Sequence, residues 1–538
     1  MSIIQAKLKE RELKLAPYVP SGNVPSPDEL NDVSDFIDTS SLLSSEDREI
    51  TTLGIDDLLK KYKDGSLKAE KVTLAYCRRL ALAQKLVNCV SEVRFDEALE
   101  EARREDEYFA KTGQLCGPLH GIVITLKDNI KVKGLPNSLG LLGLATEVET
   151  EDAAMTTLLK KLGGLIIAKS NTPSGILYSE TVNMLFGRTL NPYSRKYLNA
   201  GGSSGGEGTI AALRGSCFGV GSDLGGSVRH PAALNNVYSI KPSVGRTPCY
   251  GTLTGQPGQE SVQTVYGILS KDLDNVEYAL KAIVESRPYE AIDATCLPLE
   301  YRKVKLPDTL TIAFLDQDGL STATAPIIRG LQIVKEALKR QGHDVIEWPT
   351  TYLKELEDAI HPFYSADGYK PIRKIISESG EPLHPLLSKA FDGAKDLRVS
   401  ELWELHQKRS RLVQEYLQLW NTHNEGKRID AIIMPVSAFP ACLNMGVIPL
   451  PYTEVWNALD YSVSTFPVTR CDTKIDRPVE KSKFISELDR QVHRTYAENL
   501  DKFEGGPVAL QLVCNRLEEE KCLAMTKYVR DLLSTGEK

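Results

Sequence analysis

Residues 200–232 read AGGSSGGEGTIAALRGSCFGVGSDLGGSVRHPA and form the densest glycine and serine segment of a chain of 538 residues. A flexible linker is the ordinary interpretation of such a composition. Apolar residues such as Ile210, Leu213 and Phe218 run through this segment, however. We therefore expect its glycines to lie within packed structure, where they allow unusual φ/ψ values and close approach of the backbone.

Two nucleotide-binding motifs fit the segment poorly. A phosphate loop needs G-x-x-x-x-G-K-S/T, but no Lys-Ser or Lys-Thr pair follows these glycines. A dinucleotide fingerprint needs G-x-G-x-x-G, and the nearest match, Gly219, Gly221 and Gly225, is one residue too long. An anion site made of backbone N–H groups fits this segment better than either nucleotide-binding motif, because its small side chains leave the N–H groups accessible. Such donors could form an oxyanion site from Leu224, Gly225, Gly226 and Ser227.

The same residues carry a family resemblance. The run from GGSSGGEG to DLGGSVRHP resembles the amidase signature of the family that includes fatty acid amide hydrolases, bacterial amidases and the glutamyl-tRNA amidotransferase A subunit. Further similar stretches are GPLHGIVITLKDNI (117–130), IKPSVGR (240–246) and GGPVALQLVCNRLEEEK (505–521). The resemblance covers about residues 50 to 528 and is greatest to fungal acetamidase-type amidases.

Position by position, the resemblance implies a Ser-Ser-Lys relay. Lys127 in TLKDN is expected to be the base, Ser203 the serine that follows a cis peptide and passes the proton, and Ser227 in GGSVR the nucleophile. Ser203 is also expected to contribute to substrate binding. Supporting hydrogen bonds are expected from Ser204, Asp223 and Arg229.

The chain departs from the family pattern outside the relay. Asn235 and Asn236 occupy positions where a Cys-Gly pair is common, and Cys514 lies where glycine is usual. These changes concern local packing or the substrate pocket rather than the reaction.

The chemistry of amide cleavage suits the implied residues. A serine hydroxyl is a weak nucleophile, so a base must take its proton as the new bond forms. A lysine can do this only when it is neutral, and burial favours the neutral form. Lys127 ends the apolar run Ile122–Leu126, which suits burial. His120 and His230 are the alternative bases, but no acidic residue lies at a convincing position to orient either one, so we expect structural roles for both.

The expected activity is hydrolysis of carboxylic acid amides to a carboxylate and ammonia or an amine through an acyl-enzyme, without a metal or organic cofactor. Short aliphatic amides are the default substrates implied by the resemblance, and aromatic or fatty amides remain open. Two other classes also remain: an amidotransferase A-type subunit that delivers ammonia to a partner, and a catalytically silent amidase-like binding protein. Ammonia release by the purified single chain would distinguish a hydrolase from the amidotransferase subunit. Reaction of Ser227 with a fluorophosphonate probe would distinguish an active enzyme from the silent binding protein.

From about Gly121 onward, short apolar runs alternate with helix-like segments, which predicts an α/β fold. The resemblance implies a single large domain with a central mixed, twisted β-sheet covered by helices on both faces. Strands are expected at Ile122–Leu126, Leu165–Ala168 and Ala431–Pro435. A strand-helix-strand unit is expected from Leu310–Leu315 to Val345–Trp348, with Pro326 in the first turn of its helix and Gly342 past its end.

The N-terminal part of the sequence has a different composition and periodicity. Residues 1–50 are polar and should wrap the surface or fray, and residues 51–538 should form the amidase domain. A helical N-terminal layer is expected between about 55 and 113. In it, Ser66 could cap a helix with one buried face, made of Val72, Tyr76, Leu80 and Ala83.

Composition excludes several classes of partner. Hydrophobic residues make up 41% and charged residues 25%, as in ordinary globular enzymes. The net charge of -7 arises without a long run of like charges, so no nucleic-acid partner is expected. Ten cysteines without a C-x-x-C pair indicate reduced thiols and a cytoplasmic location. The longest apolar runs, such as Leu162–Ala168, are too short to span a membrane, and a homodimer remains open.

Overall fold

An 11-stranded mixed sheet runs through the computed structural model, which describes residues 2–535. The strand order is β1-β3-β2-β6-β8-β7-β12-β13-β11-β9-β10. The strands are β1 (Val90–Val93), β2 (Ile122–Lys127), β3 (Gly164–Ser170), β6 (Phe218–Asp223), β7 (Tyr238–Lys241), β8 (Val265–Ser270), β9 (Thr311–Phe314), β10 (Asp344–Glu347), β11 (Ala431–Pro435), β12 (Ser462–Arg470) and β13 (Pro507–Cys514). A separate hairpin pairs β4 (Val182–Asn183) with β5 (Gly187–Arg188).

The sheet combines both pairing directions. Strand β2 runs parallel to β3 and β6, and β9 runs parallel to β10 and β11. The other neighbours in the sheet are antiparallel. The predicted mixed sheet is therefore confirmed.

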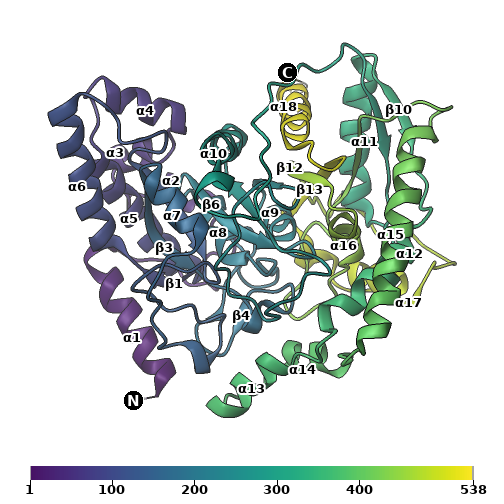
Figure 1. Ribbon diagram of the computed structural model, residues 1–538, viewed down its shortest axis with the longest axis horizontal. Helices are drawn as coiled ribbons and strands as arrows, with labels where there is room; N and C mark the ends of the chain where they lie inside the picture. Colours follow the sequence, from purple (N-terminus) through teal and green to yellow (C-terminus); the bar gives the residue numbers. More distant parts are fainter. Residues whose placement is uncertain (1, 536–538) are drawn as a thin grey trace.

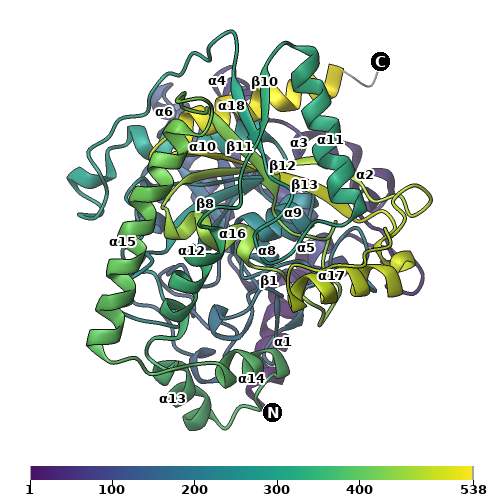
Figure 2. The ribbon, with the colours of Figure 1, turned by 90° about the vertical axis from the view of Figure 1, so that its right-hand side faces the viewer.

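Helices cover both faces of the sheet (Figures 1 and 2). They are α1 (Ile3–Leu15), α2 (Phe36–Thr39), α3 (Ser45–Ile50), α4 (Ile55–Lys63), α5 (Ala69–Val87), α6 (Phe95–Thr112), α7 (Ala154–Lys161), α8 (Gly205–Ala212), α9 (Arg229–Leu234), α10 (Leu273–Glu285), α11 (Ala325–Arg340), α12 (Leu353–Ile360), α13 (Lys370–Ser379), α14 (Pro385–Asp392), α15 (Val399–Thr422), α16 (Pro451–Ala458), α17 (Glu487–Glu498) and α18 (Glu519–Thr535).

Strand β13 shows why two layers of helices are needed. Its side chains alternate between the two faces, as in any strand. Leu510 and Leu512 belong to the apolar core that also contains side chains of α10, α11 and α18. Ala509 and Val513 belong to a second core with side chains of α9, α12 and α16. Because both faces are covered, the strand is apolar almost throughout.

The apolar runs of the sequence form the expected strands. Strand β2 is fully buried and extends one residue beyond the predicted run, to Lys127. Strand β11 has the predicted bounds. The strand-helix-strand unit is also confirmed: β9 and β10 are parallel, and α11 lies between them in the chain. Pro326 lies in the first turn of α11, and Gly342 follows the helix with a φ of +80°.

The N-terminal layer is helical, and the predicted buried face of α5 is confirmed by its four buried side chains. The predicted cap at Ser66 is wrong, because α5 begins at Ala69. The first backbone amides of α5 instead donate hydrogen bonds to the Asp106 carboxylate of α6, Ala69 N at 2.8 Å and Glu70 N at 3.0 Å. A residue from another helix thus does the capping, which no local pattern could indicate.

Residues 2–50 wrap the surface rather than fray. Lys7 of α1 forms a buried ion pair with Glu92 of β1 at 2.7 Å. Arg195 donates hydrogen bonds to the carbonyl oxygens of Pro25, Ser26 and Leu30. These contacts hold the segment against the rest of the chain, and a domain boundary at residue 50 stays a prediction.

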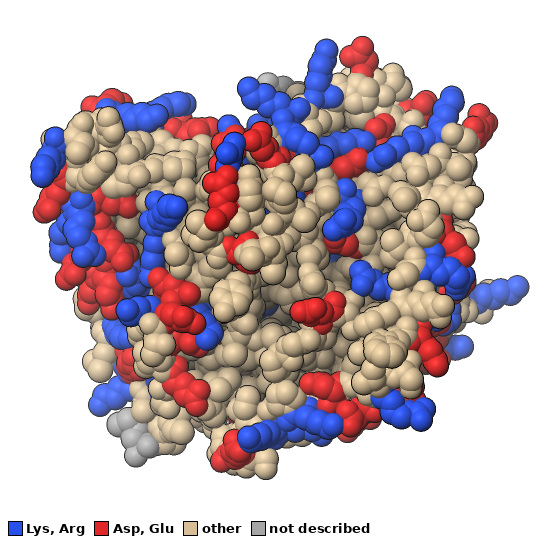
Figure 3. All heavy atoms as spheres, in the orientation of Figure 1, with Lys and Arg blue, Asp and Glu red and all other residues tan. Residues whose placement is uncertain are grey.

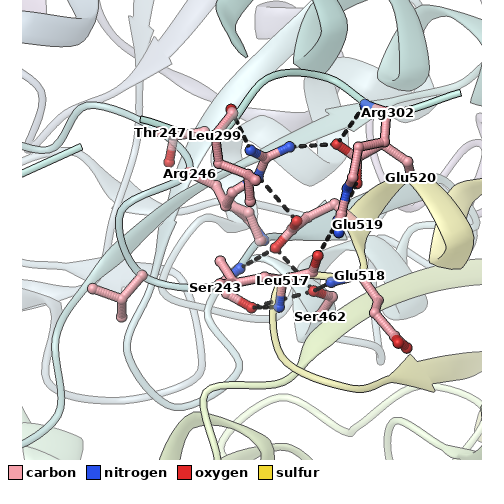
Figure 4. Close-up of polar contacts among 12 residues, drawn as sticks. Ser243, Arg246, Thr247, Leu299, Arg302, Ser462, Leu517, Glu518, Glu519 and Glu520 are labelled. Carbon is pink, nitrogen blue, oxygen red and sulfur yellow. Dashed lines mark hydrogen bonds and ion pairs between the residues drawn. The ribbon is translucent and has the colours of Figure 1, made fainter. Parts of the chain in front are cut away.

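A buried ion network joins distant segments at one end of the sheet (Figure 4). Arg246 approaches Glu519 at 3.0 Å and also pairs with Glu520, both in the first turn of α18. Glu519 accepts hydrogen bonds from Ser243 N at 2.8 Å and from Ser462 Oγ at 2.9 Å. The network therefore ties the loop after β7 to the start of β12 and to α18.

The surface mixes both signs of charge. On the face in Figure 3, basic and acidic side chains alternate around a largely uncharged centre. Within residues 2–535, no helix has the length and apolar character needed to cross a bilayer.

Candidate active site

The site forms where two parallel strands end side by side. Strand β2 pairs with β6 in the register Leu126 with Val220, so both strands leave the sheet at the same edge. Lys127 ends β2, and Ser222 and Asp223 end β6. Ligand sites of α/β sheets commonly lie at the carboxyl ends of parallel strands.

Lys127 is completely buried, and its hydrogen-bond partners are uncharged oxygen atoms. Its Nζ lies 2.6 Å from Ser203 Oγ and 2.8 Å from Ser222 Oγ. Burial lowers the pKa of Lys127 to about 7, and the more distant charges of Asp223, Glu207 and Asp128 oppose this shift only in part. A substantial share of the amine is therefore neutral near pH 7 and can accept a proton.

Ser203 precedes the first turn of α8 in a tightly packed backbone segment. The Gly202–Ser203 peptide bond is cis. A side chain at position 202 would place its Cβ 2.7 Å from the carbonyl carbon of Ser179, so glycine is required there. Ser203 itself is buried, and its hydroxyl is held toward Lys127.

Asp223 shapes the loop that follows β6. One carboxylate oxygen accepts a hydrogen bond from Gly226 N at 2.9 Å, and the other accepts one from Val228 N at 3.0 Å. The amide of Gly226 is thus already used within the loop. Within residues 2–535, the amides of Leu224, Gly225 and Ser227 make no hydrogen bond, so these three donors are available to an oxyanion.

Arg229 and Asn457 fix Asp223 in turn. The Arg229 guanidinium approaches Asp223 at 2.9 and 3.1 Å, and Asn457 Nδ2 donates to it at 3.0 Å. Burial alone would raise the pKa of Asp223, but the charge and hydrogen bonds of Arg229 hold it well below its usual range. The carboxylate therefore stays ionised and continues to accept the hydrogen bonds of the Gly226 and Val228 amides.

Helix α16 supports the loop from behind. Thr453 Oγ1 donates to Gly225 O at 2.7 Å, and Tyr364 Oη donates to Leu224 O at 3.2 Å. Gly226 has a φ of +123°, and a Cβ there would lie 2.2 Å from Thr453 Oγ1. Only glycine fits this position without moving the helix.

Ser227 lies half-buried at the end of this loop. Its carbonyl accepts a hydrogen bond from Ser204 N at 3.1 Å, which joins the loop that follows β6 to the segment that carries Ser203. Ser204 Oγ in turn donates to Ser222 O at 3.4 Å. The fold thus gathers the residues expected from the sequence around one edge of the sheet.

Neither candidate histidine is placed to act as the base. His230 is buried, both of its ring nitrogens lack a partner within residues 2–535, and burial lowers its pKa to about 4. His120 precedes β2, at the opposite end from Lys127, and its Nδ1 accepts a hydrogen bond from Cys116 N. The expectation of structural histidines agrees with these positions.

Four further residues complete the site without having been singled out from the sequence. They are Asn129, Ser222, Thr453 and Asn457. Asn129 and Ser222 lie inside the quoted motifs. The pairing of β2 with β6 could have indicated Ser222, because the ends of parallel neighbours meet. Thr453 and Asn457 come from a helix more than 200 residues away along the chain, and their contacts with the loop depend on the fold.

Asn235 and Cys514, two of the residues that depart from the family pattern, are buried, and Asn236 is half-buried. Asn235 Nδ2 donates to the carbonyl oxygens of Ala200 and Pro231, both at 2.8 Å. Cys514 ends β13 opposite Ser462 of β12. Both residues therefore act in packing.

The site combines an amine that is hydrogen-bonded to a hydroxyl, Lys127 with Ser203, and backbone amides without partners within residues 2–535. These two features meet two needs of acyl transfer. The amine can receive a proton from a hydroxyl nucleophile, and the amides can hold the resulting oxyanion.

Comparison with known proteins gives a consistent picture. A family model described as Amidase matches residues 71–523. An acetamidase of Emericella nidulans is 37% identical over 514 residues, which cover 93% of each chain. Amidase 1 of Gibberella moniliformis is 33% identical and is matched over 91% of this chain and 94% of its own length.

Solved structures agree. A fatty acid amide hydrolase superposes with a TM-score of 0.92 at 32% identity, over 99% of this chain and 96% of its own. A structure described as an amidase superposes with a TM-score of 0.69 at 21% identity, which shows a shared fold.

Proposed function

Because this chain belongs to the amidase family, whose activity is the hydrolysis of amides, we propose that it cleaves the C–N bond of linear amides by a relay of Ser227, Ser203 and Lys127. One observation carries the proposal: the buried Lys127 Nζ lies 2.6 Å from Ser203 Oγ. A lysine in this setting has the lowered pKa that a base at neutral pH requires.

The proposed reaction has two halves. Ser227 Oγ attacks the carbonyl carbon, and its proton passes through Ser203 Oγ to Lys127 Nζ. The amides of Leu224, Gly225 and Ser227 hold the tetrahedral oxyanion. Its collapse breaks the C–N bond, and the proton returns through Ser203 to the leaving nitrogen.

A water molecule then attacks the acyl-enzyme ester and gives its proton to the same relay. The carboxylate leaves, and Ser227 is regenerated. Each oxyanion donor is expected to contribute about 10² to 10³ in rate, and positioned proton transfer about 10² to 10⁴. Loss of any relay member should therefore remove nearly all turnover.

Short aliphatic amides are the proposed substrates. This rests on the likeness to proteins named acetamidase, one of them 37% identical over 93% of both chains. The alignment with this acetamidase covers nearly the whole of both chains, which favours an enzyme that acts alone over a subunit that passes ammonia to a partner. A cytoplasmic location belongs to the same proposal, since all ten cysteines, each within residues 2–535, are unpaired thiols.

Ammonia release from a panel of amides by the purified chain tests the proposal. Ser227→Ala should lose activity and labelling by a fluorophosphonate probe while its circular dichroism is unchanged. Ser410→Ala, an exposed serine on α15, should behave as the wild type. Ser227→Ala retaining more than a few per cent of the wild-type rate would refute the nucleophile assignment. A wild-type chain that releases ammonia only with a second protein would favour the subunit alternative.

A further inference from the structure

Two buried glutamates face each other behind the loop that follows β6, and their carboxyl groups are hydrogen-bonded to each other. Glu357 lies on α12 and Glu454 on α16, and their exposed fractions are 8% and 3%. The Oε2 atom of each has no other hydrogen-bond partner within residues 2–535. Buried carboxylates are normally paired with donors or cations. In the same described part of the chain no lysine or arginine forms an ion pair with either glutamate, so an added cation could compensate their negative charge.

A histidine completes a three-sided cluster with the two carboxylates. His361 follows α12 directly, and its Nδ1 lies 3.8 Å from Glu357 and 3.9 Å from Glu454. One ligand atom from each of the three residues lies within 4.8 Å of the others. The imidazole is 71% exposed, so an ion could reach the cluster from solvent.

The surrounding charges leave the cluster acidic. Asp318 faces Glu357, and the nearby Arg229 is already paired with Asp223. Tyr364 is half-buried near both glutamates.

We propose that Glu357, His361 and Glu454 form a binding site for a divalent transition-metal ion such as zinc. Two carboxylates and one imidazole, with water at a fourth position, are a ligand set that zinc accepts. The imidazole disfavours magnesium and calcium, which prefer oxygen ligands. Ligands about 2.0–2.2 Å from zinc lie about 3.3–3.6 Å apart in a tetrahedron, so the two distances from His361 Nδ1, 3.8 and 3.9 Å, need to shorten only slightly.

The site is separate from the proposed relay but adjacent to its loop. Glu454 follows Thr453, whose hydroxyl holds the Gly225 carbonyl. A Cβ on Gly225 would lie 3.3 Å from Glu454 Cγ. An ion that draws Glu454 toward His361 would therefore act on the segment that positions the amides of the loop.

Another cluster in the described chain has the composition of a metal site, but its polar atoms are already used. Glu105 accepts a hydrogen bond from Gly121 N at 2.7 Å, and His120 Nδ1 accepts one from Cys116 N at 3.2 Å. Cys116 is exposed and could bind zinc as an isolated thiol. This second cluster supplies a control for background binding.

Zinc titration of the chelator-stripped full chain, in competition with a chromogenic chelator, tests the proposal. The wild type should bind one more zinc ion than His361→Ala, and Glu454→Gln should weaken that site more than about 10-fold, since even outer partners of metal sites cost about 10- to 100-fold. Glu355→Gln, an exposed residue of α12, and Cys116→Ser should both retain it. Equal zinc binding by the wild type and His361→Ala would overturn the proposal, as would tighter binding of magnesium than of zinc.

Thermal unfolding provides a second readout that does not depend on activity. Zinc should raise the Tm of the wild type and of Glu355→Gln but not that of His361→Ala, because an ion bound only by the native state stabilises it. Without metal, Glu357→Gln should unfold at the wild-type temperature or above, since it removes one of two buried acidic groups. A zinc-induced shift of equal size in His361→Ala would contradict the assignment even if a glutamate variant failed to fold.

Discussion

The single most consequential side chain is Lys127, because its proton state sets the pH at which the proposed relay works. Only the neutral amine can take the serine proton, and burial brings its pKa to about 7. We therefore predict that kcat/KM falls about tenfold per pH unit below pH 7, with an apparent pKa near 7 in the free enzyme. Lys127→Met should remove nearly all turnover at every pH. Measured pH profiles of both proteins check this.

Histidine variants provide the matched controls for this profile. His120→Ala and His230→Ala should keep substantial activity and the same acid limb, since neither ring contacts the relay. Lys127→Ala and Ser227→Ala should not add in the double mutant, because both break one proton path. Near-normal turnover of Lys127→Ala, with loss in either histidine variant, would mean that the base is a histidine.

A substitution at Gly226 tests whether the loop that follows β6 positions the oxyanion donors. The φ of Gly226, +123°, and the 2.2 Å approach of a Cβ to Thr453 Oγ1 leave no room for a side chain. Gly226→Ala should displace the amides of the loop and lower kcat by about 10² or more. Gly258→Ala also has a positive φ, but its Cβ would meet open space, so it controls for backbone strain alone. Equal activity of the two variants would contradict the role of the loop.

The sequence indicated the proposed relay and the supporting residues Ser204, Asp223 and Arg229, but not the support from Ser222 and from helix α16. Lys127, Ser203 and Ser227 could be named because they occupy positions in a recognisable motif. Ser222 lay within the same motif, yet its contact with Lys127 depends on the pairing of β2 with β6. Thr453 reaches the loop through a fold-level contact over 228 residues, which no local pattern encodes.

At the level of elements, helix α16 acts as a support for the loop that follows β6 and carries Ser227. Thr453 Oγ1 holds the Gly225 carbonyl, and Asn457 holds Asp223. Thr453→Val keeps the shape of the side chain but removes this hydrogen bond, so kcat should fall about 10-fold, equivalent to about 1.4 kcal/mol. Thr453→Ser should restore most of the rate. A merely structural role would instead leave kcat unchanged and lower the unfolding temperature of both variants.

Elements were predictable where one local signal dominated. The apolar run at Ile122–Leu126 and the run at Ala431–Pro435 became buried strands because both faces of the sheet are covered. The pairing of β12 with β13 was not predictable, because the order of the central strands depends on contacts between distant segments. The cap of α5 failed as a prediction for the same reason: Asp106 comes from the next helix.

For the molecule as a whole, the Arg246 network links the middle of the chain to its last helix. Its guanidinium is buried against Glu519 and Glu520. Arg246→Ala would leave the buried carboxylate of Glu519 without its cation and Glu520 with Arg302 alone, and loss of one partner of a buried pair typically costs about 3–5 kcal/mol of the free energy of unfolding. Guanidinium denaturation measures this loss. Arg302→Ala, whose side chain is 44% exposed, should cost much less. Equal stability of Arg246→Ala and the wild type would show that the network contributes little.

The burial of Lys127 also connects catalysis to proton release during folding. In the unfolded chain the amine has its ordinary pKa of 10.5, whereas in the native state the value is about 7. Between these two values the unfolded chain binds more protons, so the contribution of Lys127 to native stability becomes more favourable as the pH rises from about 7 toward 10.5. At about pH 9, each molecule that folds discharges nearly one proton from this single side chain. The amine that accepts a proton in every proposed turnover is thus also a group whose proton is released as the chain folds at alkaline pH.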